Sequence, residues 1–73
     1  MITHFQNEKS EIIATKDLSA PPQIGSCFAL NDGRKKNLQV YIITSVIYVV
    51  NVPTDFYMVV IKWQAEAPYL KVL

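Results

Sequence analysis

The stretch VYIITSVIYVV, residues 40–50, determines the fold class of this chain. It consists of β-branched residues, two tyrosines and one serine, which favour strands over helices. No charge occurs between Lys36 and Asp55. A membrane-spanning helix needs about 20 consecutive apolar residues, however, and Asn51 and Pro53 interrupt this run. We therefore expect a long strand of a soluble β domain that does not enter a membrane.

The length and composition indicate one small domain over residues 1–73. A chain of 73 residues is near the size at which a single core only just offsets the entropy lost on folding. The net charge of +1 provides no general attraction to nucleic acid. The lone Cys27 forms no internal disulfide, and the mixed, polar start MITHFQNEKS does not resemble a secretory signal. We expect a cytoplasmic protein in which Cys27 is buried and inert.

Turn residues divide the chain into segments with an apolar period of two, which is typical of strands. The expected strands cover residues 24–30, 38–50, 56–64 and 69–73, with Asp32-Gly33 and Pro53 in the connecting turns. Residues 8–16 fit a short helix or a strand, and we prefer the strand. Residues 1–10 are expected to include a flexible arm.

The order and lengths of these segments resemble those of SH3-like small barrels. The resemblance covers a first segment PPQIGSCFAL, a charged loop NDGRKKN, a long hairpin, a short turn and a terminal strand YLKVL. It implies an all-β, mainly antiparallel fold: a five-stranded barrel or a strongly bent meander, since closure removes exposed sheet edges. An OB-like barrel is the nearest alternative. The acidic and aromatic peptide groove of signalling SH3 domains has no counterpart in the sequence, so the resemblance does not imply that ligand.

The long hairpin is apolar on both faces near its turn. The even positions of residues 38–50 are expected to face the core. In the returning strand, Tyr57, Val59, Ile61 and Trp63 are expected to share one face. The odd positions begin polar and become apolar toward the turn, and a strand with two apolar faces is usually covered twice. A β-bulge that exchanges the two faces, the N-terminal segment or another molecule would provide the second cover.

The sequence contains few groups for catalysis. His4 is the single histidine and is expected to be solvated, and the carboxylates fall mainly in turns and termini. No cluster of metal ligands occurs, and two glycines do not make a phosphate loop. We expect no enzyme activity, no cofactor, no metal and no small-molecule substrate.

The remaining interpretation is a protein-binding module. Tyrosine, tryptophan and arginine beside an apolar sheet are the usual anchors of interfaces. The candidate partner-binding residues are Arg34, Lys35, Lys36, Tyr41, Ile43, Ile47, Tyr57 and Trp63. Such a module acts as a homodimer, as an accessory subunit, or as a small inhibitor of the kind that bacteriophages and mobile elements encode, by occluding or bridging its partner. The alternative is a small barrel that binds nucleic acid through the basic triplet 34–36 and surface aromatics.

Overall fold

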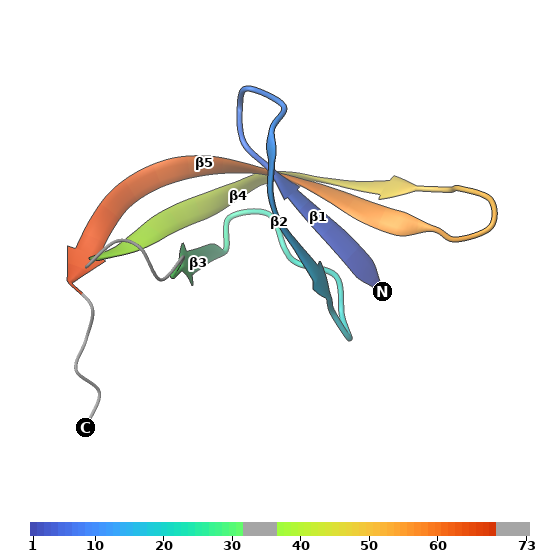
Figure 1. The fold of residues 1–73 in the computed structure, drawn as a ribbon, viewed down its shortest axis with the longest axis horizontal. Helices are drawn as coiled ribbons and strands as arrows, with labels where there is room; N and C mark the ends of the chain where they lie inside the picture. Colours follow the sequence, from blue (N-terminus) through green and yellow to red (C-terminus); the bar gives the residue numbers. More distant parts are fainter. Residues whose placement is uncertain (32–36, 69–73) are drawn as a thin grey trace.

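The computed structural model describes residues 1–31 and 37–68, and this part contains five strands and no helix (Figure 1). The strands are β1 (Ile2–Gln6), β2 (Ile12–Asp17), β3 (Cys27–Leu30), β4 (Asn37–Val49) and β5 (Phe56–Pro68). The all-β class is therefore confirmed, and residues 12–16, for which a helix was the alternative, are in a strand. None of the described segments is a helix of the length and apolarity that crossing a bilayer requires. The basic triplet 34–36 and the expected strand at 69–73 lie outside the described residues.

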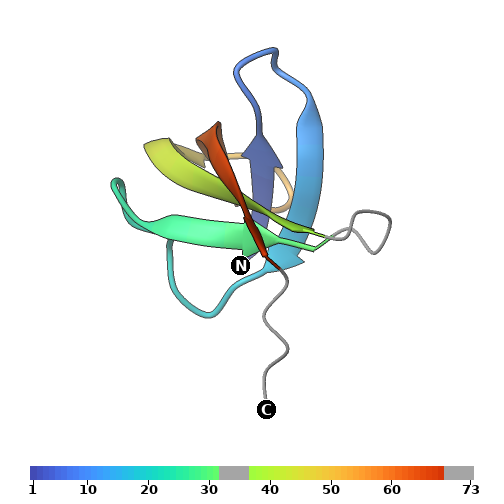
Figure 2. The ribbon, with the colours of Figure 1, turned by 90° about the vertical axis from the view of Figure 1, so that its left-hand side faces the viewer.

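The strands form one mixed sheet in the order β2-β1-β5-β4-β3. β1–β2, β3–β4 and β4–β5 pair antiparallel, as a meander requires, whereas β1 and β5 pair in parallel. The sheet curls into a half-barrel, and its edge strands β2 and β3 lie on two sides of the interior without pairing to each other (Figure 2). The small barrel-like architecture is thus present in a partly open form.

The N-terminal segment is a strand inside the sheet, and the expectation of a flexible arm over residues 1–10 is wrong for β1. β1 lies between β2 and β5, so its backbone is paired on both sides. Alternation turns Thr3 and Phe5 inward, where they are buried, and the Phe5 ring lies 5.0 Å from the ring of Phe28. The sequence gives no sign of this because the parallel pairing with β5 joins residues more than fifty positions apart.

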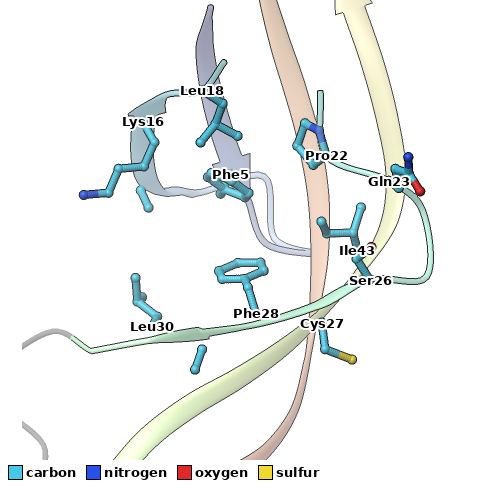
Figure 3. A pocket seen from close by; sticks show the side chains of 12 residues that line it. Phe5, Lys16, Leu18, Pro22, Gln23, Ser26, Cys27, Phe28, Leu30 and Ile43 are labelled. Carbon is cyan, nitrogen blue, oxygen red and sulfur yellow. The ribbon is translucent and has the colours of Figure 1, made fainter. Parts of the chain in front are cut away.

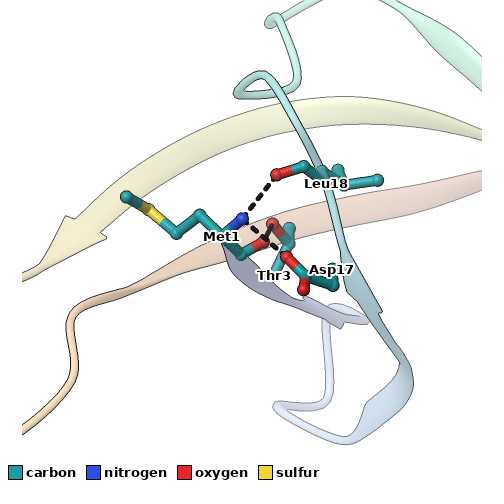
Figure 4. Close-up of polar contacts among 4 residues, drawn as sticks. All are labelled: Met1, Thr3, Asp17 and Leu18. Atoms are coloured by element: carbon teal, nitrogen blue, oxygen red, sulfur yellow. Dashed lines mark hydrogen bonds and ion pairs between the residues drawn. The ribbon is translucent and has the colours of Figure 1, made fainter.

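Polar contacts extend the pairing of β1 with β2 beyond the ends of both strands (Figure 4). The amino group of Met1 donates to the Asp17 carboxylate at 2.6 Å and to the carbonyl oxygen of Leu18 at 2.5 Å, and the Leu18 N–H donates to the Met1 carbonyl oxygen. His4 is also held in place: its Nδ1 lies 2.8 Å from Thr15 Oγ1. These contacts fix the start and the middle of a strand that was expected to be loose.

A β-bulge exchanges the faces of β4 in the middle of the hairpin. Ile43 pairs with Ile61 and Ser45 with Val60, so Thr44 has no partner in the register. Before the bulge the odd positions face the core, where Gln39 and Ile43 are buried, and after it Val46 packs against the core. The expectation that the even positions form the core along the whole strand is therefore wrong before Thr44, because the extra residue inverts the alternation.

The core is small and lies on the concave side of the sheet. Its buried apolar residues are Phe5, Ile43, Val59 and Ile61, with Ile13, Ala14, Leu18, Phe28, Tyr41, Val46 and Tyr57 packed around them. Of the residues expected to share one face of β5, Val59 and Ile61 belong to the core and Tyr57 packs against it. With so few fully buried side chains, the loss of any one of them removes a large part of the stabilising apolar burial.

The tip of the β4–β5 hairpin is held by one carboxylate. The Tyr48 hydroxyl donates to Asp55 Oδ2 at 2.5 Å, and the Asn51 backbone N–H donates to Asp55 Oδ1 at 2.9 Å. The hydrogen bond from Tyr48, followed by that from Asn51, lowers the pKa of Asp55, and the same bond raises the pKa of Tyr48. Tyr48 is exposed and Asp55 is partly exposed at the hairpin tip, so solvent screens their interaction.

We expect acid to remove the contribution of this contact to stability. Because folding lowers the pKa of Asp55, the unfolded chain binds the proton first, and the stabilisation present above the ordinary carboxyl pKa is lost as the pH falls through the lowered value. The thermal midpoint of the wild type should therefore exceed that of Asp55→Asn at neutral pH, and the difference should shrink in acid. An unchanged difference from about pH 7 to about pH 2 would contradict this role.

Candidate functional site

A hollow of about 300 Å³ lies between the turn that joins β1 to β2 and the half of the β4–β5 hairpin that is far from the hairpin turn. It is lined by Asn7, Glu8, Lys9, Glu11, Tyr41, Ile61 and Trp63. Tyr41 and Trp63 are register partners on neighbouring strands, and Ile61, two residues before Trp63, is fully buried. The hollow therefore combines an aromatic and apolar part with a charged rim.

The indole of Trp63 is held by a chain of hydrogen bonds that starts in the protein interior. Trp63 Nε1–H donates to Gln39 Oε1 at 2.9 Å, and Gln39 Nε2 donates to Glu66 Oε1 at 3.2 Å. Asn37 Nδ2 donates to the other carboxylate oxygen of Glu66 at 3.2 Å. Gln39 is only 7% exposed, whereas Trp63 is 51% exposed. The single polar group of the indole is thus satisfied internally, and its rigid ring remains available at the surface.

A second bulge makes this chain of contacts possible. Val40 pairs with Ala65 and Tyr41 with Trp63, so Gln64 is the extra residue on β5. The bulge places Glu66 on the same face as Trp63, where strict alternation would place it on the opposite face. The register of β4 and β5 therefore positions the Glu66 carboxylate on the same face as the indole.

The turn between β1 and β2 fixes the charged rim of the hollow. Asn7 Oδ1 accepts the backbone N–H groups of Lys9 at 2.9 Å and Glu11 at 3.0 Å, and Asn7 Nδ2 donates to Glu11 Oε1 at 3.1 Å. Ser10 has a φ of 65°, a left-handed conformation that closes the turn. The rim contributes two carboxylates, Glu8 and Glu11, and one ammonium group, that of Lys9. Its formal charge is therefore negative.

This combination is complementary to a cation. An aromatic face attracts a guanidinium or ammonium group through the ring quadrupole. Arginine is the better match, because its planar guanidinium stacks on an indole while its N–H groups donate to a carboxylate. Trp63 supplies the face and Glu8 and Glu11 supply the carboxylates.

A second hollow, of about 360 Å³, opens between the edge strands β2 and β3 (Figure 3). The rings of Phe5 and Phe28 lie at its centre, and Leu18, Leu30 and Ile43 continue its apolar lining. Five of its lining residues, Phe5, Ala14, Leu18, Phe28 and Ile43, belong to the core or pack against it, so this hollow opens into the interior of an incompletely closed barrel. It contains no arrangement of charges that specifies an occupant, and for this reason we place the candidate site at Trp63.

Cys27 borders this second hollow, but its side chain points away from the Phe5 and Phe28 rings (Figure 3). The thiol is exposed. The expectation of a buried cysteine is therefore wrong, because Cys27 begins β3 on the face opposite to Phe28.

The structure brings together two of the candidate residues named from sequence, Tyr41 and Trp63. Ile47 is exposed on the distal part of β4, far along the hairpin register from Trp63. Ile43 is 4% exposed and belongs to the core, and Tyr57 packs against that core and the Tyr48 ring, which corrects their placement at the surface. The basic triplet 34–36 lies outside the described residues. The sequence did not indicate four lining residues of the hollow, Asn7, Glu8, Lys9 and Glu11, or the residues whose hydrogen bonds hold Trp63, which are Asn37, Gln39 and Glu66.

No protein-family model matches the chain, and comparisons with curated proteins and with solved structures give no match. Across residues 1–31 and 37–68, no group of three or more histidine, cysteine or acidic side chains is placed to hold a metal ion. The chemical properties of the hollow are therefore the basis for assigning a role.

Proposed function

We propose that this chain is a non-enzymatic protein-binding module that receives a basic side chain of a partner protein in the hollow around Trp63. One observation carries the proposal: a half-exposed tryptophan is held in a fixed orientation by a glutamine that is buried beneath the surface. Burying an amide side chain is unfavourable unless its hydrogen bonds are made. Here they are made to Trp63 and Glu66, so the buried amide serves to fix the exposed ring.

The contacts around the ring favour an arginine on an extended partner segment. Because the indole N–H is already bonded to Gln39, the ring offers its face and not a donor to a ligand. Glu8 and Glu11 supply acceptors at the rim, and Tyr41 adds a second aromatic wall. Tryptophan, tyrosine and arginine are the residue types that contribute most to the affinity of protein interfaces.

A module of this kind acts by occluding or bridging its partner. The hollow accommodates one or two side chains, so it anchors a contact whose remaining area comes from the surrounding sheet. This mode of action fits an accessory subunit or a small inhibitor in the cytoplasm, as the sequence led us to expect.

Tryptophan fluorescence provides the test, because Trp63 is the only tryptophan. The probe is a short acetylated peptide with a central arginine in an apolar context, and its twin carries citrulline, which keeps the shape but removes the charge. We expect the arginine peptide to shift the emission to shorter wavelength with a Kd of about 0.1–1 mM, since one side chain anchors it. The citrulline twin should bind at least about tenfold more weakly, and added salt should raise the Kd of the arginine peptide.

Equal responses to both peptides, or no response to either, would overturn the proposal. A short single-stranded oligonucleotide is titrated in parallel. A shift with the oligonucleotide and none with the arginine peptide would favour the nucleic-acid alternative instead.

A further inference from the structure

The distal half of β4 is a strand edge without a partner among the described residues. β3 pairs with residues 39–42 of β4, and the last backbone hydrogen bonds on that side join Ile43 to Gly25 and Ser26. Beyond this point β4 pairs only with β5 in the part of the chain that the structure describes. In Figure 1 the hairpin continues well past β3. The backbone N–H and C=O groups on the outer side of residues 44–49 therefore lack a sheet partner.

The other sheet edges carry features that discourage pairing, and this edge does not. Charged side chains, proline and short length are the usual protections of an edge strand. β2 carries Lys16 and Asp17, β3 has four residues, and β5 beyond its pairing with β1 carries Lys62, Glu66 and Pro68. Residues 44–50 contain no charge, no proline and no glycine. Ile47 and Tyr48 on this edge are 48% and 49% exposed, and Val50, which directly follows β4, is 76% exposed.

We propose that this edge pairs with the same edge of a second copy of the chain, in antiparallel orientation about a two-fold axis. An unpaired edge accepts an extended strand, because only a strand presents complementary N–H and C=O groups along its length. A two-fold contact is isologous, so the same stretch of residues from each copy forms both sides of the interface. A charge near the centre would face its own copy, and residues 44–50 have none. The two sheets then join into one, and the exposed apolar side chains on both sides of the edge become covered.

Sedimentation equilibrium of purified variants tests the pairing. We expect the wild type to dimerise reversibly below about 1 mM. Ile47 lies in the middle of the edge, so Ile47→Lys should give a monomer, since two ammonium groups would then face each other across the axis. Ile12→Lys is the matched control: it places the same charge on another strand edge, at a residue with a similar exposed fraction of 54%, and should leave the dimer intact.

Mixing variants distinguishes a second copy from any other occupant. Ile47→Lys and Ile47→Glu should each be monomeric alone and should form a one-to-one heterodimer when mixed, because opposite charges then meet across the axis. A monomeric wild type at about 1 mM, a dimer that persists in Ile47→Lys, or a mixture that stays monomeric would each overturn the inference. Trp63→Ala should still dimerise, so failure of the dimer and failure of the arginine site are separate outcomes.

Discussion

Replacing Phe5 by alanine is expected to lower the free energy of unfolding by about 3–5 kcal/mol, which is the usual cost of removing a buried phenylalanine. Phe5 is 7% exposed, contacts Phe28 across the half-barrel and belongs to a core with few fully buried residues. A domain of this size has a total stability on the order of 5 kcal/mol. The variant should therefore be largely unfolded, or melt at least about 12 °C below the wild type in a thermal scan followed by circular dichroism.

Ile2→Ala is the control for this prediction. Ile2 is on the same strand but points to the other face and is 41% exposed, so its truncation should cost less than about 1 kcal/mol. Equal and small effects of the two substitutions would mean that β1 is not part of the cooperative fold. That result would restore the expectation of a loose N-terminal arm.

Replacing Trp63 by alanine is expected to weaken binding of the arginine peptide at least about 30-fold, which corresponds to about 2 kcal/mol and is typical of a central interface tryptophan. The change removes the face on which the guanidinium stacks, together with much of the apolar wall of the hollow. Because the ring is half-exposed, the fold should persist. The measurement is fluorescence anisotropy of a labelled peptide, which does not depend on the missing tryptophan.

Two further variants test whether the loss of affinity is specific to the hollow and whether it depends on the hydrogen bond that orients the indole ring. Ile12→Ala removes a similarly exposed apolar side chain outside the hollow and should leave the affinity unchanged. Gln39→Met keeps the size of the buried side chain but frees the indole N–H, so the ring loses its fixed orientation. We expect an intermediate loss of about threefold to tenfold for Gln39→Met. An effect of Gln39→Met on stability without any effect on affinity would show that Gln39 is structural only.

Much of the fold follows from short-range pattern in the sequence. The β-branched run at residues 40–50, the turn at Pro53 and the alternation from Tyr57 to Ile61 predict the long hairpin and the face that Tyr57, Val59 and Ile61 share. β1 could not be predicted in this way. Its five residues ITHFQ carry only Phe5 as a large inward apolar side chain, and their position depends on parallel pairing with β5.

The candidate site was only half predictable, for a related reason. Trp63 and Tyr41 are conspicuous by residue type, and the sequence marked both. Gln39 gave no such signal, because a glutamine in a strand usually faces solvent. It is buried here because the bulges at Thr44 and Gln64 set which side chains share its face, and bulge positions depend on pairing between distant residues.

The indole N–H resonance of Trp63 tests the cation-binding hollow most directly, because a ¹⁵N-labelled chain gives one such signal. We predict that the arginine peptide shifts this resonance together with the amides of Tyr41 and of residues 8–11, while the citrulline twin shifts them little at the same concentration. Shifts centred instead on Leu18 and Phe28 in the second hollow, between β2 and β3, or no shifts at all, would contradict a cation-binding hollow at Trp63.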